Sequence, residues 1–187
     1  MKLLWLYGLI LFPAIALAET CPIEISSYPV SGESIEQIAK QISLFGPIDD
    51  AGTRRDAFLR WDIGWRWDLH NGKPDYRTLK VSCSAKLIKP THRNPEKLSA
   101  ADLAEWKRYL NALDQHEYEH YQLIKSNFAR VEAVLADAIS ADPNLHYSKA
   151  NRAASLALSE LRRLDRDLDQ RSDHGRLDGV KLVSISR

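Results

Sequence analysis

Hydrophobic and polar residues alternate with a period of two in two stretches of the first half of the chain. In FLRWDIGWRWDLH, residues 58–70, the apolar positions are Leu59, Trp61, Ile63, Trp65, Trp67 and Leu69. In LKVSCSAKLI, residues 79–88, every second residue from Leu79 to Leu87 is apolar. Such alternation is typical of strands with one buried face and one solvated face. Because the HNGKPD segment between them carries Asn-Gly and Pro turn signals, the two stretches predict an antiparallel hairpin.

Three tryptophans, Trp61, Trp65 and Trp67, fall on the same face of the first predicted strand. A row of exposed aromatic rings could bind carbohydrate. Buried aromatic side chains, however, make large contributions to hydrophobic cores. We therefore favour a core role, in which these rings pack against a covering helix.

A helical period replaces the alternation in the second half of the chain. Ser99 and Asp102 form a capping box, and Asp142-Pro143 ends the segment. The apolar residues that share one face of this long helix are Leu103, Trp106, Leu110, Leu113, Ile124, Phe128, Val131 and Leu135. A second helix is predicted at about residues 148–168, after which DQRSDHGRLDGV shows no helical pattern.

The segment before the hairpin predicts three shorter elements. ISSYPVSG has the character of a strand that ends in a turn, and ESIEQIAKQISLFGP that of a helix stopped by Gly46-Pro47. IDDAGTRRD has no periodicity and is expected to be a loop. Together the elements predict an α+β fold, in which an antiparallel sheet packs on a long helix with further helices. Without repeats or linkers, residues 19–187 are expected to form a single domain.

The first eighteen residues, MKLLWLYGLILFPAIALA, have the features of a secretory signal peptide. A lysine is followed by an apolar run and by Ala16-Leu17-Ala18, a typical A-x-A cleavage site. The alternative is an uncleaved anchor, but the apolar run is shorter than the ~20 residues that a spanning helix needs. We therefore expect an exported protein, periplasmic or secreted, without stable membrane insertion after cleavage.

The charge balance and the cysteine content bear on the binding partners and on the disulfide bonding of the protein. The chain has 26 lysines and arginines, of which Lys2 lies in the signal peptide, and 25 acidic residues. This near-neutral balance argues against nucleic-acid binding, which needs a concentrated basic face. The two cysteines, Cys21 and Cys83, are expected to form one disulfide in an oxidising compartment, with two separate buried thiols as the alternative.

The sequence HEYEH at residues 116–120 fits the H-E-x-x-H pattern of zinc hydrolases. His116 and His120 are four residues apart, so on a helix both imidazoles point to the same side and can bind one tetrahedral ion. Glu117 then lies beside the pair, where its carboxylate can serve as general base. The alternative is a chance arrangement on a charged helix.

The helical wheel separates the members of this motif. His120 and Glu117 fall within the apolar face of the long helix and His116 falls at its edge, whereas Tyr118 and Glu119 point away. An ionised glutamate on a core face is costly unless a function requires it. The wheel therefore favours a metal site over coincidence.

A catalytic zinc ion takes three protein ligands and keeps one open position. We expect His174, in the segment SDHGR, to be the third, because Gly175 permits close backbone approach and neighbouring aspartates could orient the ring. The alternative ligands are Asp169, Asp173 and Glu160.

The other histidines of the exported part lie in predicted loops. His70 is beside the Asn-Gly turn, His92 is in a proline-flanked segment, and His146 follows the end of the long helix. We expect each of them to be a surface residue and not a ligand.

Four segments carry a resemblance to a known family. They are YPVSG near the start, WDIGWRW in the first strand, the long helix with its Trp106 and HEYEH, and DQRSDHG near the end. With these segments the chain resembles a bacterial family of predicted secreted zinc-dependent proteases, also called a domain of unknown function. The resemblance covers most of the chain after the signal peptide.

In that family the last segment tends to contain an aspartate, then a threonine or serine, then His-Gly. The matching positions here are Asp169, Ser172, His174 and Gly175. The family often has a tyrosine before the aspartate, where this chain has Leu168. The resemblance implies a predicted activity and leaves the substrate open.

The leading hypothesis is an exported zinc metallopeptidase with a small zincin-like domain, in which Glu117 is the general base and His116, His120 and His174 hold Zn²⁺. Its substrate would be a peptide or protein, which an edge strand of the sheet could hold by strand addition. One alternative is a zinc amidase acting on peptidoglycan or another non-protein amide. Another is a non-catalytic zinc-binding interaction module. The oligomeric state is not predicted.

Overall fold

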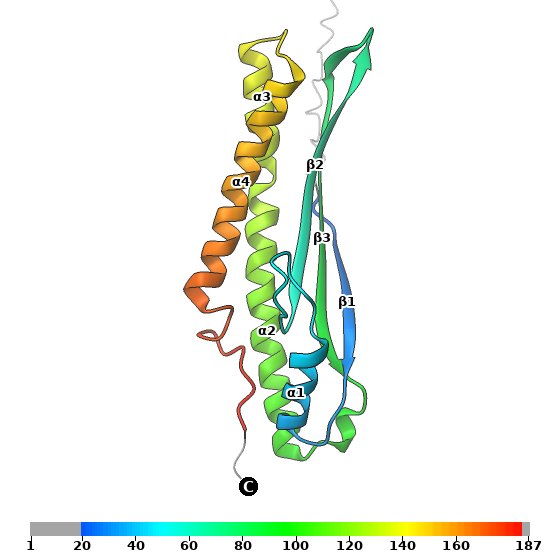
Figure 1. Cartoon of the computed structure of the whole chain (residues 1–187), viewed down its shortest axis with the longest axis vertical. Helices are drawn as coiled ribbons and strands as arrows, with labels where there is room; N and C mark the ends of the chain where they lie inside the picture. Colours follow the sequence, from blue (N-terminus) through cyan, green and yellow to red (C-terminus); the bar gives the residue numbers. More distant parts are fainter. Residues whose placement is uncertain (1–19, 185–187) are drawn as a thin grey trace, which may run out of the picture.

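The computed structural model describes residues 20–184, so the predicted signal peptide lies outside the described residues. The elements in chain order are β1 (Ile23–Val30), α1 (Ile35–Phe45), β2 (Phe58–His70), β3 (Lys73–His92), a short 3-10 helix η1 (Pro95–Lys97), α2 (Ala100–Asn127), α3 (Ala129–Ala141) and α4 (Tyr147–Ser172). This arrangement confirms the predicted α+β class. It is elongated, with the long helices on one side and the sheet on the other (Figure 1).

The predicted hairpin is confirmed, with a tighter turn and a longer second strand. Strand β2 pairs antiparallel with β3 from Phe58 to His70. The turn has two residues, Asn71 and Gly72, with φ angles of 51° and 76°. Positive φ at both positions is what a two-residue hairpin turn with the right-handed strand twist requires. As a result β3 begins directly at Lys73 and continues to His92.

The first strand makes the sheet mixed and not purely antiparallel. The strand order is β1-β3-β2, and β1 runs parallel to β3 from Ile23 to Val30. Helix α1 and the loop that follows it return the chain, so that Phe58 at the start of β2 lies across β3 from Ser26 in the middle of β1, both residues being paired with Ile88. Among the strands of residues 20–184, β2 is an edge strand that pairs with β3 on one side.

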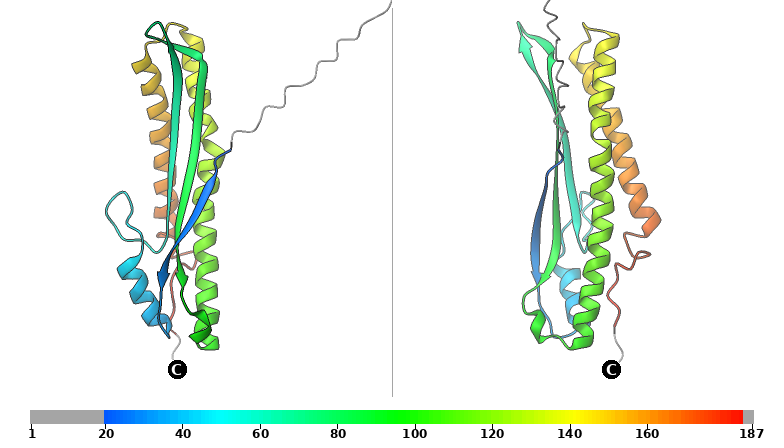
Figure 2. Two further views of the ribbon diagram at one scale, coloured as in Figure 1. Left: turned by 90° about the vertical axis from the view of Figure 1, so that its right-hand side faces the viewer. Right: turned by 180° about the vertical axis from the view of Figure 1, so that it is seen from behind.

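The helices cover one face of the sheet, and α2 runs along most of its length (Figure 2). The tryptophans of β2 are partly buried against this layer, as the core interpretation predicted. The indole N–H of Trp61 donates to Asp165 at 3.0 Å, and that of Trp65 donates to Asn151 at 2.9 Å. These bonds fix the lateral position of α4 on the hairpin.

The long helix that the sequence predicted as one segment is divided at Phe128 into α2 and α3. Side chains in the last turn of α2 compete for its carbonyls: Asn127 Nδ2 donates to Leu123 O, and Ser126 Oγ donates to Gln122 O. Such bonds from side chains to the preceding turn disturb the helical ladder. The axis still continues into α3, because Phe128 keeps helical dihedrals of −65° and −33°.

Helix α4 is longer than predicted and ends at Ser172, about one turn beyond residue 168. The charged composition of this last turn hid its helical character. The extension places Asp169 on the same face of the helix as Asp165, one turn further on. Both carboxylates consequently face α2.

The core consists of two clusters along the length of the molecule. One cluster lies at the α1 end and includes Tyr109 and Leu113, and the other lies at the hairpin end and includes Ile124 and Phe128. Between Leu113 and Ile124, helix α2 buries three polar residues, His116, Glu117 and His120. The H-E-x-x-H motif thus forms a polar layer between two apolar ones.

Two other predictions concern residues outside this layer. The structure places Cys21 and Cys83 at bonding distance, with Cα atoms 4.7 Å apart, as the predicted disulfide requires. His92 was expected at the surface, but that prediction is wrong. It is 8% exposed, its Nε2 lies 2.9 Å from Gly32 O, and its ring contacts Trp106. His70 and His146 are exposed as predicted.

Within residues 20–184, no helix combines the length and the apolar character that crossing a membrane would need.

Candidate metal centre

Three side chains from two helices converge on one point. His116 and His120 come from α2 and Asp169 comes from α4, and each offers a ligand atom within 4.8 Å of the other two. The Nε2 atoms of the histidines are 3.3 Å apart, and Asp169 Oδ1 lies 3.3 Å from His116 Nε2 and 3.1 Å from His120 Nε2. This group could hold a metal ion.

The size of this triangle suits a small tetrahedral cation. Nitrogen and oxygen ligands bind zinc at ~2.0–2.1 Å, so two ligands of a tetrahedral ion lie roughly 3.3 Å apart. The three separations match that spacing. Two imidazoles and a carboxylate are also a common zinc donor set.

A second aspartate of α4 orients one of the rings. Asp165 Oδ1 lies 2.7 Å from His120 Nδ1, and its other oxygen accepts the indole N–H of Trp61. A carboxylate on the far nitrogen of a ligating histidine sets its tautomer and leaves Nε2 free for metal. Sequence reasoning missed Asp165. Its spacing of four from Asp169 was the available signal, had the helix been extended that far.

The carboxylates hold His120 in its charged form when no metal neutralises them. Burial alone would lower the pKa of His120, but the hydrogen bonds to Asp165 and Asp169 outweigh it and raise the pKa to about 10. For Asp169, burial acts to raise the pKa, and the hydrogen bonds from His116 and His120 reverse this and lower it well below its usual range. Asp169 is therefore an anion at neutral pH, as a metal ligand must be.

Glu117 is buried beside the three converging side chains. Glu117 is 7% exposed, and its burial raises the pKa of its carboxyl group to about 7. The nearby His120 and His116 oppose this increase, and a backbone hydrogen bond from Leu59 does so too. A carboxyl group with a pKa near 7 can both accept and donate a proton at physiological pH. The predicted orientation of the motif is confirmed, since Tyr118 and Glu119 are exposed.

The four candidates for the third ligand lie at different positions relative to His116 and His120. His174 is not one of the three converging residues, but its Nδ1 lies 3.2 Å from Asp169 Oδ2, so it contacts the group from outside. Asp173 lies 3.8 Å from Arg176, and Glu160 pairs with Arg163 on the surface of α4. Among the alternatives that the sequence left open, Asp169 is therefore the one placed with His116 and His120.

A strained turn packs the residues after α4 against the site. Asp173, His174 and Gly175 have φ angles of 49°, 53° and 77°, all in the left-handed region. A Cβ atom on Gly175 would lie 2.9 Å from His116 Cγ and 2.5 Å from Val180 Cγ2. Glycine at 175 is thus required both by its backbone conformation and by the close approach of the turn to the His116 ring.

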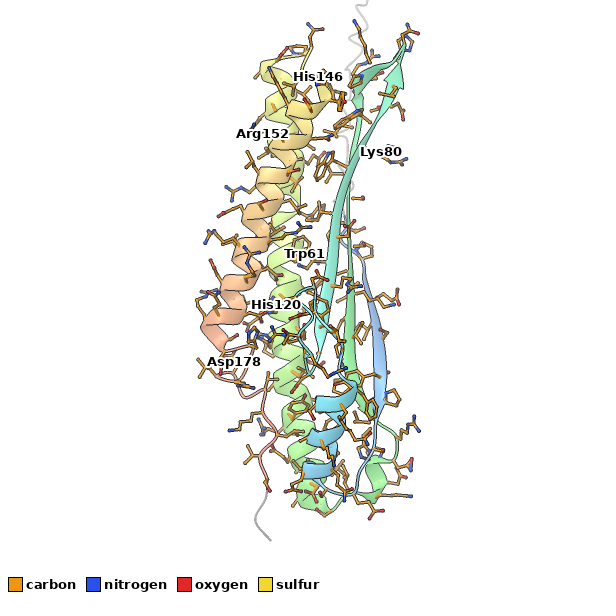
Figure 3. All side chains as sticks on the ribbon, in the orientation of Figure 1. Trp61, Lys80, His120, His146, Arg152 and Asp178 are labelled. Atoms are coloured by element: carbon orange, nitrogen blue, oxygen red, sulfur yellow. A yellow bond between two sulfur atoms is a disulfide. The ribbon has the colours of Figure 1, made fainter. Side chains whose placement is uncertain are left out.

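The site opens into a cleft of about 630 Å³. Its lining includes residues of α1 and of the loop at residues 49–57, and residues of the end of α4 and of the tail at residues 180–182. His116, Glu117 and His120 also line it, together with Phe58 and Leu59 at the start of the edge strand β2. Figure 3 shows His120 in this region, between α2 and the lower end of α4, with Trp61 above it and Asp178 below.

A family model described as "Bacterial protein of unknown function (DUF922)" matches residues 25–175. The chain belongs to this family. The match runs from β1 to Gly175 and so includes every residue of the metal group together with Asp165, Glu117 and His174. Comparison of this DUF922 protein with curated proteins and with solved structures returned no match.

Proposed function

We propose that this DUF922 protein is an exported zinc metallopeptidase with its active site at His116, Glu117 and His120. The observation that carries the proposal is the convergence of His116 Nε2, His120 Nε2 and Asp169 Oδ1 beside a buried glutamate, in the lining of a cleft. A purely stabilising zinc site is usually closed by four protein ligands. Three converging ligands and a general base at a cleft favour catalysis.

His116, His120 and Asp169 would hold the ion, and zinc bound there would supply a Lewis acid that polarises an amide carbonyl and acidifies water. Asp165 keeps the Nδ1 proton of His120 in place, so that Nε2 presents its lone pair to the site. The Trp61 indole in turn holds Asp165 in position.

Glu117 would carry the proton during hydrolysis. Its carboxylate takes a proton from the attacking water and then donates it to the nitrogen of the leaving amine. The low-polarity surroundings that raise its pKa to about 7 make both transfers accessible near neutral pH. The backbone N–H of Leu59 would limit the rotation of the carboxylate.

A peptide substrate is favoured by the position of β2. Within residues 20–184 this strand pairs with β3 alone, and its first residues, Phe58 and Leu59, line the cleft. An extended peptide could add to the free edge of β2 by main-chain hydrogen bonds, which would lay a peptide bond across the site. We propose that export through the signal peptide brings this activity to the periplasm or the medium.

The test compares Glu117→Gln with the wild-type protein in metal content and in hydrolysis of a mixed peptide library and of purified peptidoglycan. We expect the variant to retain zinc, because Glu117 is not one of the converging ligands, and to lose at least a hundredfold in hydrolysis, as removal of a general base does. Mass spectrometry of the products would separate a peptidase from a peptidoglycan amidase.

The matched control is Glu119→Gln, which makes the same change two residues away on the exposed side of α2. It should hydrolyse substrate like the wild type. Equal activity of Glu117→Gln and Glu119→Gln would contradict the general-base role.

A further inference from the structure

The two histidines of the metal group differ in what their Nδ1 atoms contact. His120 Nδ1 lies 2.7 Å from Asp165, whereas His116 Nδ1 has no hydrogen-bond partner among the described residues. The His116 ring is also the more buried, at 4% side-chain exposure. A buried polar nitrogen without a partner is unfavourable in a folded protein, and such exceptions call for a specific explanation.

When a metal ion is bound to Nε2 of His116, the proton of the ring must be on the unpartnered Nδ1. Its Nε2 faces His120 and Asp169 at 3.3 Å and is the atom available to a metal ion. A ligating imidazole is neutral, so a metal on Nε2 requires a proton on Nδ1. Ligating histidines nearly always donate this second N–H to a carboxylate, a carbonyl or water.

Asp178 is the carboxylate that faces this nitrogen. Its Oδ2 lies 3.9 Å from His116 Nδ1, which is about 1 Å beyond a hydrogen bond. The Asp178 side chain is 47% exposed, so it has room to rotate. Asp165 and Asp169 do not compete for this role, because they face His120 Nδ1 and the two Nε2 atoms.

The turn that bears Asp178 is anchored to the same helix as His116. The Arg108 guanidinium donates to Gly179 O at 2.9 Å and to Lys181 O, and Glu105 on the preceding turn of α2 accepts the Val183 N–H at 2.8 Å. Asp178 N in turn donates to Gly175 O at 3.0 Å, and Gly175 is the residue packed on the His116 ring. Helix α2 therefore holds both the ligand and the turn that faces it.

We infer that Asp178 is a positioning residue of the metal centre: its carboxylate accepts the Nδ1–H of His116 and keeps Nε2 directed at the metal. The site then has a carboxylate behind each histidine, Asp165 from α4 for His120 and Asp178 from the tail turn for His116. The inference rests on the metal site of the proposed function, but it does not depend on which bond the protein hydrolyses.

The test measures zinc affinity by chelator competition in the wild type and in Asp178→Ala. We expect the variant to bind zinc ~10–100-fold more weakly, the usual loss when the partner of a ligating histidine is removed. In ¹⁵N-labelled zinc-loaded wild type, the Nδ1 protons of both His116 and His120 should be visible and protected from exchange. In Asp178→Ala the His116 signal should disappear and the His120 signal should stay.

Asp173→Asn is the matched control, since it removes one negative charge from the same turn while keeping a residue that tolerates left-handed φ. Its zinc affinity should stay within about twofold of the wild type, as for other surface substitutions. If Asp178→Ala does not fold, Asp178→Ser serves, because its hydroxyl is too short to reach His116.

Either an Asp178→Ala affinity no lower than that of the control or a persisting His116 Nδ1 proton would overturn the inference. A wild-type protein without zinc affinity would overturn the metal centre and this inference together. Zinc binding without any hydrolysis would contradict the proposed peptidase alone.

Discussion

At the scale of the single residue, two side chains of the same type differ in burial, pKa and hydrogen-bond partners according to their surroundings. Glu117 and Glu119 are two positions apart on α2, but Glu117 is buried with a pKa of about 7 and Glu119 is exposed. His116 and His120 belong to one motif, yet Asp165 lies behind only one of them at hydrogen-bonding distance. The protonation and hydrogen bonding of each side chain therefore depend on its surroundings as well as on its residue type.

A comparison of Asp169→Ala with His174→Ala tests which of the two residues is the third zinc ligand. Asp169→Ala removes an oxygen placed within 3.3 Å of both histidine Nε2 atoms, so we expect zinc affinity to fall by two orders of magnitude or more, in the range of a lost ligand. His174→Ala removes a ring that contacts Asp169 from outside and should cost ~10–100-fold. Chelator competition on both variants measures the difference, and a larger loss in His174→Ala would restore His174 as the ligand.

Metal binding should be coupled to proton release. The pKa of His120 is raised to about 10 in the metal-free protein, so the ring is charged at pH 7 and must lose its proton to bind an ion. Zinc affinity should consequently increase about tenfold per pH unit between pH 6.5 and 8. Calorimetric titration in two buffers of different ionisation enthalpy measures the released proton. A pH-independent affinity would contradict a protonated His120.

At the scale of the elements, the turn after α4 packs so closely on His116 that a single added methyl group should disturb it. Gly175→Ala would force a Cβ into the left-handed region and against His116 and Val180, so we expect unfolding free energy to fall by about 1–3 kcal/mol and zinc affinity to fall with it. Urea denaturation and chelator competition measure the two effects.

Gly72→Ala is the control for this substitution. Gly72 has nearly the same φ, 76°, but a Cβ added there would meet no atom of the described residues within 4 Å beyond its own chain neighbours. The variant should show the backbone cost without any loss of zinc affinity. Equal zinc affinities in the two variants would mean that the turn does not position His116.

The elements also show where sequence patterns stop being informative. The hairpin and the capping box of α2 were predicted correctly, since strand alternation and caps depend on neighbouring residues. The last turn of α4 was missed, because its residues are charged and its helical state is supported by contacts with α2 and β2. Without that turn, the position of Asp169 one helical turn beyond Asp165 could not be found, and the pairing of the two carboxylates was missed with it.

At the scale of the whole molecule, two apolar clusters enclose one polar layer. The cluster at the hairpin end includes Cys21 and Cys83, which tie the segment before β1 to the middle of β3 across 62 residues of sequence. This connection matters because β1 joins the sheet in parallel, a pairing that no short turn supports.

Replacing both cysteines, as Cys21→Ala/Cys83→Ala, should lower the free energy of unfolding by about 4 kcal/mol, the loop-closure contribution expected for this separation. Urea denaturation of the oxidised wild type and of the double variant measures the change. Zinc affinity of the folded variant should be unaffected, because the cysteines belong to the apolar cluster at the hairpin end and not to the polar layer. Coincident urea midpoints would show that the disulfide adds no stability.

Local sequence patterns were enough to predict the α+β class, the tryptophan face of the hairpin, and the orientation of His116, Glu117 and His120 on one side of a helix. These features depend on periodicities of two and of 3.6 residues, which are set by backbone geometry within each segment. The three-dimensional packing was needed to show that Asp169 joins the histidines, that Asp165 and Asp178 face them, and that β1 runs parallel to β3. Those outcomes depend on which surfaces pack together across more than forty residues of chain, and no local pattern encodes that choice.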